Sequence, residues 1–142
     1  MPVTHIPVSI PDASTYTVLA DNSGCTHWLP DLSQDITITL PTPKAGLRFK
    51  FAYAGAAADA ADWIFSTGSA SNYFKGGMVF LDTDAADTGD EVSTIHSDGN
   101  SNDTLTILTP QAGTWVEVEC ADGTTWNLNG VAVSVTVPTI AD

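Results

Sequence analysis

The chain has 142 residues, of which 43% are apolar, and its 17 acidic and four basic side chains give a formal charge of −13 at pH 7. A chain of this length forms about one domain without disulfides or metal ions, and no run approaches the roughly 20 apolar residues of a membrane span. Its acidity excludes functions that rest on neutralising phosphate, so we expect neither nucleic acid nor anionic membrane as a partner.

Residues 1–14 predict an extended N-terminal arm. Pro2, Pro7 and Pro11 forbid a helix and prevent full pairing as a central strand. The apolar residues between the prolines suit either a contact with a neighbouring molecule or a strand-like start that packs on the chain's own domain. The residues predicted to make the contact with such a neighbour are Val3, His5, Ile6, Val8 and Ile10.

Residues 15–142 predict one all-β domain. Apolar and polar side chains alternate at 16–20, 36–40 and 47–53, which is the period of a half-buried strand. In the third of these segments Phe49 and Phe51 fall on one face, whereas Arg48 and Lys50 fall on the other. Phe49 and Phe51 are therefore expected in the core.

The middle of the chain is less regular. The alanine-rich stretch 54–61 predicts a loop or a single helical turn, and 68–77 is rich in turn residues. The continuous apolar runs at 63–65 and 78–81 are typical of strands that are covered on both faces. An acidic polar loop is expected over 82–91.

The last third predicts a meander of short strands. The pairs Asp98-Gly99 and Asp122-Gly123 are strong hairpin signals, and alternating valines follow at 131–137. We find no internal repeat and no amphipathic helix of ten residues or more. Short strands separated by Gly, Pro and Asp turns predict a single compact β-sandwich or partly closed β-barrel.

The acidic loop is the strongest candidate for a metal site. Asp82, Asp84, Asp87 and Asp90 supply the oxygen ligands that calcium prefers, and the turn at 98–103 is a weaker case. Their spacing does not match an EF-hand, so we favour a solvated loop and predict no bound metal.

Catalytic patterns are missing from the sequence. Most of the 14 aspartates lie in turn-like segments, where Asp is favoured for local hydrogen bonding. There is no G-x-S-x-G elbow and no glycine-rich phosphate loop, and the three histidines are scattered. We therefore predict that the protein is not an enzyme and needs no cofactor. Cys25 and Cys120 allow one disulfide, but free thiols are favoured in a protein assembled in the cytosol.

Two features point to protein binding. Lys44, Arg48 and Lys50 lie within seven positions, where they suit an acidic neighbour or simply offset local self-repulsion. Trp115 shares a strand face with Glu117, so it is either an exposed aromatic of an interface or a strand-end residue under a loop. These four cationic and aromatic residues, Lys44, Arg48, Lys50 and Trp115, form the predicted protein interface.

Together these strand and turn patterns resemble those of tailed-phage capsid decoration proteins, also called cement or head-stabilising proteins. The segments that carry the resemblance are YTVLADNSG at 16–24, DITITLP at 35–41, AGLRFKF at 45–51, WIF at 63–65, Gly76-Gly77 and DGTTW at 122–126. The resemblance covers most of the chain after the arm. It implies a homo-oligomer, usually a trimer at three-fold capsid positions, that contacts the major capsid protein and has no catalytic residue.

We therefore expect a structural protein on the exterior of a virion capsid, assembled in the host cytoplasm without a signal peptide. A cement subunit bridges capsomers, which suits a rigid β body and an arm that adds contacts. The first alternative is a glycan-binding module of a phage head or tail fibre, which needs an exposed aromatic groove using Trp28, Trp115 or Trp126. The second is a hydrolase that uses the acidic loop, which needs a deep pocket with converging carboxylates.

Overall fold

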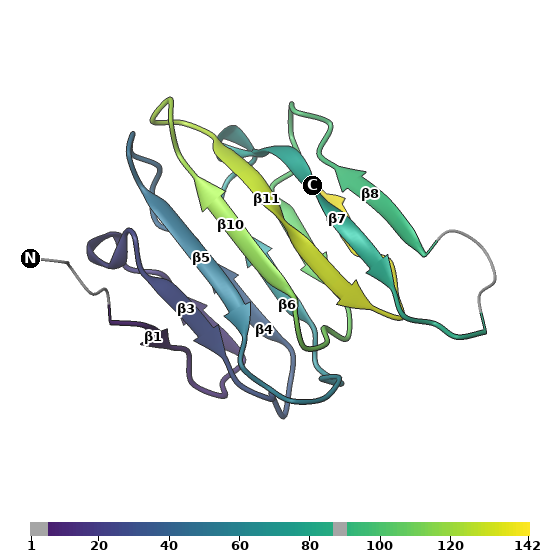
Figure 1. Cartoon of the computed structure of the whole chain (residues 1–142). Helices are drawn as coiled ribbons and strands as arrows, with labels where there is room; N and C mark the ends of the chain where they lie inside the picture. Colours follow the sequence, from purple (N-terminus) through teal and green to yellow (C-terminus); the bar gives the residue numbers. More distant parts are fainter. Residues whose placement is uncertain (1–5, 87–90) are drawn as a thin grey trace, which may run out of the picture.

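The computed structural model describes residues 6–86 and 91–142, which fold into two mixed β-sheets packed face to face (Figure 1). The seven-stranded sheet has the spatial order β1 (Val8–Ser9), β3 (Thr26–Leu29), β5 (Arg48–Tyr53), β10 (Trp115–Glu119), β11 (Trp126–Ser134), β7 (Phe74–Asp82) and β8 (Val92–His96). The five-stranded sheet has the order β12 (Thr139–Ala141), β9 (Thr104–Ile107), β6 (Trp63–Ser66), β4 (Ile36–Thr39) and β2 (Thr15–Thr17). The predicted all-β fold is confirmed as a β-sandwich rather than a barrel.

Helical structure in the described residues is limited to two 3-10 turns, η1 (Ala20–Asn22) and η2 (Ala70–Asn72). No helix found there has the length and apolar character needed to cross a membrane. The stretch 54–61 is a loop. Its buried Asp59 carboxylate accepts the backbone N–H of Leu32 at 3.0 Å, which holds this loop against the chain that follows β3.

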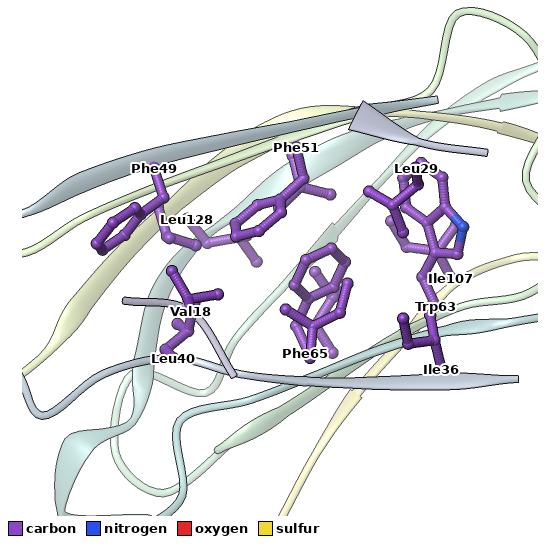
Figure 2. Close-up of a cluster of buried hydrophobic side chains, with 14 of the residues drawn as sticks. Val18, Leu29, Ile36, Leu40, Phe49, Phe51, Trp63, Phe65, Ile107 and Leu128 are labelled. Atoms are coloured by element: carbon purple, nitrogen blue, oxygen red, sulfur yellow. The ribbon is translucent and has the colours of Figure 1, made fainter. Parts of the chain in front are cut away.

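The core lies between the sheets and is built from the alternating apolar residues. Phe49 and Phe51 of β5 are fully buried, and Figure 2 shows them pointing toward residues of the other sheet. The ring centroids of Phe51 and Phe65 are 4.9 Å apart, and those of Phe49 and Trp126 are 6.0 Å apart. Aromatic rings at these separations stabilise the packing beyond their burial alone.

The predicted meander is wrong, because the last third alternates between the two sheets. β8 pairs with β7 in the seven-stranded sheet, whereas β9 pairs with β6 and β12 in the five-stranded sheet. The turn at Asp98-Gly99 is therefore a crossing between the sheets, and the Asp98 carboxylate holds it by accepting the N–H of Asn100 and Ser101 at 2.9 and 3.0 Å. The second hairpin signal, Asp122-Gly123, does join antiparallel strands, β10 and β11.

β7 is longer than the sequence predicts, because the glycines of the expected turn lie inside the strand. A Cβ on Gly77 would meet the Ile95 carbonyl oxygen of β8 at 2.0 Å, and one on Gly76 would meet the Leu128 carbonyl oxygen of β11 at 2.8 Å. Only glycine permits neighbouring backbones to approach so closely. Gly76 and Gly77 thus hold β7 between its two partners.

Replacing Gly77 by alanine is expected to lower the free energy of unfolding by about 1–3 kcal/mol, because the new methyl group would push β8 away from β7. Urea unfolding measures this change. Gly99→Ala is the control: its Cβ meets open space, so only the left-handed backbone, with φ of 71°, is penalised. An unchanged free energy of unfolding in Gly77→Ala would contradict the close approach of β8 to Gly77.

The continuous apolar runs are covered on one face only, contrary to expectation. In β6, Trp63 and Phe65 are buried, whereas Ile64 between them is partly exposed. In β7, Met78 and Phe80 are buried, whereas Val79 is partly exposed on the outer face of the sheet. The sandwich has two layers, so each sheet keeps one outer face that nothing in the described part of this chain covers.

Candidate functional site

Three of the four predicted interface residues meet on the outer face of the seven-stranded sheet, the face toward the viewer in Figure 1. Pairing of β5 with β10 places Lys50 opposite Glu117. The Arg48 guanidinium donates to both Glu117 carboxylate oxygens, at 3.1 and 3.2 Å. The Lys50 ammonium lies 4.9 Å from the centre of the Trp115 ring. The strand register alone thus brings two cations, an aromatic and a carboxylate into one cluster.

These contacts orient the side chains more than they stabilise the fold. The Arg48 side chain is 58% exposed, and exposed ion pairs are worth about 0–1 kcal/mol. An exposed cation–π contact such as that between Lys50 and Trp115 is worth about 0.5–1 kcal/mol. The cluster can therefore exchange these contacts for those of a partner at little cost. Lys44, the fourth predicted residue, lies in the exposed turn before β5, and it is not among the residues that line the pocket described next.

A pocket of about 320 Å³ lies beside this cluster. Its lining residues are Gly24, Cys25, Thr26, Arg48, Lys50 and Glu117. Two cations line it against one carboxylate, so it is suited to receive an acidic group. Cys25 is partly buried at its wall and Cys120 is buried in the core, and both are free thiols, as the sequence favoured.

A third cation on the same outer face was not predicted from the sequence. Lys75 lies on β7, its ammonium 3.4 Å from the Asp122 carboxylate and 5.7 Å from the centre of the Tyr73 ring. The pKa of Asp122 is lowered, chiefly by the Thr125 hydroxyl and backbone N–H and less by Lys75. No signal marked Lys75, because the glycines beside it indicate a turn rather than a strand face.

The structure shortens the predicted arm. Val8 and Ser9 form β1, which pairs in parallel with β3, and the Ile10 N–H donates to the Trp28 carbonyl at 2.9 Å. Ile10 is 2% exposed, so the prediction that it contacts a partner is wrong: the side chain fills the chain's own core. The body therefore begins at Val8 rather than at residue 15.

Of the other predicted arm residues, Ile6 is 80% exposed and free to contact a partner, whereas Val8 is partly buried at the sheet edge. Val3 and His5 lie outside the described residues. Around Pro7 and Pro11 the chain is extended as predicted, but extended backbone at Val8 and Ser9 is also what a parallel edge strand requires.

In the acidic loop the carboxylates are engaged with the backbone. Asp82 accepts the N–H of Asp84, and Asp84 accepts the N–H of Ala86, each at 2.9 Å. Asp87 and Asp90 lie outside the described residues. Across 6–86 and 91–142, no three His, Cys, Asp or Glu side chains are grouped as metal ligands.

The tryptophans offered for a glycan groove lie in different places. Trp126 is fully buried in the core and is not available to a ligand. Trp28 is 38% exposed on β3, and Trp115 is partly exposed on β10. Both pair with Ala52 of the strand between them, so they stand on the same outer face, two strands apart.

Comparison of the chain with protein-family models, with curated proteins and with solved structures finds no match.

Proposed function

We propose that this protein is a structural subunit that coats and stabilises the exterior of a tailed-phage capsid by binding the major capsid protein. The observation that carries the proposal is the filled two-layered body. Most of its large apolar side chains pack in one core, and its contact groups gather on an outer sheet face. A rigid body with a broad contact face suits a subunit that holds neighbouring capsomers together.

The charge distribution supports the same function. Particles densely coated with a chain of charge −13 repel one another, which keeps them apart in solution. The strand and turn segments resemble those of decoration proteins, and this resemblance implies that the copies assemble as homotrimers. A symmetric trimer engages several capsid subunits at once, so individually weak contacts add up to firm attachment.

Binding to phage heads that lack the protein tests the proposal. Purified wild-type chain is expected to sediment with such heads and to raise the temperature at which they open, because a ligand that binds the assembled state stabilises it. Heads that stay bare, or that open at an unchanged temperature, would contradict the function. Light scattering on the free protein measures the expected trimer.

The shortened arm gives a second test. Deleting residues 1–7 keeps β1 and Ile10, so the free energy of unfolding is expected to change by less than about 0.5 kcal/mol. The affinity for heads is expected to fall, because the exposed Ile6 and the residues before it are removed. Cosedimentation measures this affinity, and a truncated chain that coats heads as well as wild type would remove the arm from the proposal.

Binding of a host glycan is the second candidate, favoured by the two tryptophans on one outer face. Trp28 and Trp115 are two strands apart, which places them about 10 Å from each other, within reach of a short saccharide. Quenching of tryptophan fluorescence by oligosaccharides that disappears in Trp28→Ala would support this candidate. Head binding without quenching would support decoration instead.

A further inference from the structure

The outer faces of the two sheets have opposite chemistry. On the five-stranded sheet, register pairing builds two cross-strand rows in which eight of ten residues carry a hydroxyl group. The rows are Thr15, Thr37, Ile64, Thr106 and Thr139, and Thr17, Thr39, Ser66, Thr104 and Ala141. Neither row contains a charge. Water can satisfy the hydrogen bonds of these hydroxyl groups, so this face needs no protein partner to cover it.

The outer face of the seven-stranded sheet carries an apolar row instead. Strand pairing sets five consecutive strands in register, and every residue of the row is apolar: Trp28, Ala52, Trp115, Val131 and Val79. A second apolar row continues along three strands with Val133, Leu81 and Val92. Val92 is 59% exposed. Contiguous apolar surface of this kind marks interaction sites in soluble proteins.

The same face holds most of the positive charge of the chain. Arg48, Lys50 and Lys75 point outward beside the apolar row, and they are three of only four basic residues. The outward strand residues of this face include two acids, Glu117 and Glu119, and the Asp122 carboxylate pairs with Lys75, so the charges of this face balance. All other residues together hold 14 acids and one base. Within the described residues, this face therefore repels an acidic partner least, and its cations can bond to the partner's carboxylates.

We propose that the outer face of the seven-stranded sheet is the capsid-facing side, which binds an acidic protein surface with apolar anchors, while the threonine-rich face stays in solvent. This inference rests on the proposed function and names its contact face and the chemistry of the partner. Carboxylates of the partner meet Arg48, Lys50 and Lys75, and its apolar side chains cover the row from Trp28 to Val79. Such an attraction weakens as salt screens it.

Two pairs of double variants test the inference on heads that lack the protein. The first test variant, Val79→Thr with Val131→Thr, places hydroxyl groups in the apolar row at nearly constant volume. Its control, Thr37→Val with Thr106→Val, makes the reverse change on the five-stranded sheet. The second test variant, Lys50→Gln with Lys75→Gln, lowers the net charge by two, and its control, Thr37→Glu with Thr104→Glu, lowers the net charge by the same amount on the five-stranded sheet. All eight substitutions are outside the core, and thermal unfolding checks that each variant folds.

Both variants of the seven-stranded sheet are expected to bind heads at least about tenfold more weakly than wild type, since a weaker attachment of each copy is multiplied in an oligomer. The charge variant is also expected to lose most of its salt dependence, whereas both controls are expected to bind as wild type. If wild type binds heads and the variants of this face bind equally well, the inference fails and the function stands. Wild type that does not bind heads overturns both.

Light scattering on the same variants separates a foreign partner from a second copy of this chain. An unchanged oligomeric state together with weakened head binding supports a capsid partner on this face. Variants that dissociate into monomers would show that the face joins copies to one another, which would overturn the inference.

Discussion

Replacing Phe51 by alanine is expected to lower the free energy of unfolding by about 3–5 kcal/mol, among the largest effects that a single substitution can have in this chain. The ring is fully buried on the central part of β5, and its centroid lies 4.9 Å from that of Phe65 in the opposite sheet and 5.0 Å from that of His27. Its removal would leave a cavity where the two sheets meet. Urea unfolding, monitored through tryptophan fluorescence, measures the lost free energy of unfolding.

Ile64→Ala is the matched control for Phe51→Ala. Ile64 is also a large apolar strand residue, but it is on the outer face of β6 and only partly buried. Its truncation is expected to cost less than about 1.5 kcal/mol, because little apolar area returns to water and no closed cavity forms. Similar losses in the two variants would contradict the assignment of Phe51 to the centre of the core.

Mild acid is expected to destabilise the protein through His27. The side chain is fully buried among Phe49 and Phe51, and neither ring nitrogen has a hydrogen-bond partner within the described structure. Burial lowers the pKa of His27 below its ordinary value of 6.5. Backbone groups of Cys25 and Lys50 favour the charged ring, but they do not reach hydrogen-bonding geometry, so burial prevails.

The direction of the pH effect follows from this lowered pKa. Above about pH 6.5 both the folded and unfolded chains hold a neutral His27, and its contribution to stability is complete. Below that pH, His27 binds a proton in the unfolded chain but stays neutral in the folded chain, so the free energy of unfolding falls by at most about 1.4 kcal/mol per pH unit. The fall ends once the pH reaches the folded-state pKa.

Carboxylates act in a lower pH range. The pKa of Asp98 is lowered to about 2, first by the backbone N–H of Ser101 and then by that of Asn100. The ionised Asp98 therefore adds to the free energy of unfolding above the ordinary carboxyl pKa, and this contribution is lost only as the pH falls from about 4. Unfolding measured from about pH 7.5 to 4.5 therefore separates the effect of His27 from that of Asp98.

His27→Leu tests this assignment. Leucine fills a similar volume and leaves no unpartnered nitrogen, so the free energy of unfolding at neutral pH is expected to rise by about 1–3 kcal/mol. The slope between about pH 6.5 and 4.5 is expected to disappear. His96→Leu, on the exposed edge of β8, is expected to keep the slope. A slope that survives in His27→Leu would assign the acid sensitivity to another group.

Several elements were predictable because they depend only on neighbours in the chain. Alternation placed Phe49 and Phe51 in the core and Arg48 and Lys50 outside it, and both assignments are confirmed. The Asp122-Gly123 hairpin is also confirmed, since its two strands are consecutive. Asp98-Gly99 carries the same local signal, yet the strands around it belong to different sheets. A turn motif bends the chain, but it does not choose the partner of the next strand.

The candidate interaction face was predictable only in part. Arg48, Lys50 and Trp115 were singled out because they lie outward on their own strands. Lys75 was missed because Gly76 and Gly77 indicate a turn, and their role as close-packing strand residues depends on β8 and β11 on either side. Ile10 was misplaced for a related reason: an apolar residue among prolines is extended both in a free arm and at a sheet edge.

The sequence by itself determined the all-β class, the inward and outward sides of most strands and the acidity of the molecule, because these follow from side-chain type and a two-residue period. Only the tertiary structure decided the order and direction of the strands. It also decided that Trp28, Ala52, Trp115, Val131 and Val79 form one row. Those residues come from five strands of which only β10 and β11 are consecutive, so interstrand hydrogen bonding between distant segments sets the row side by side.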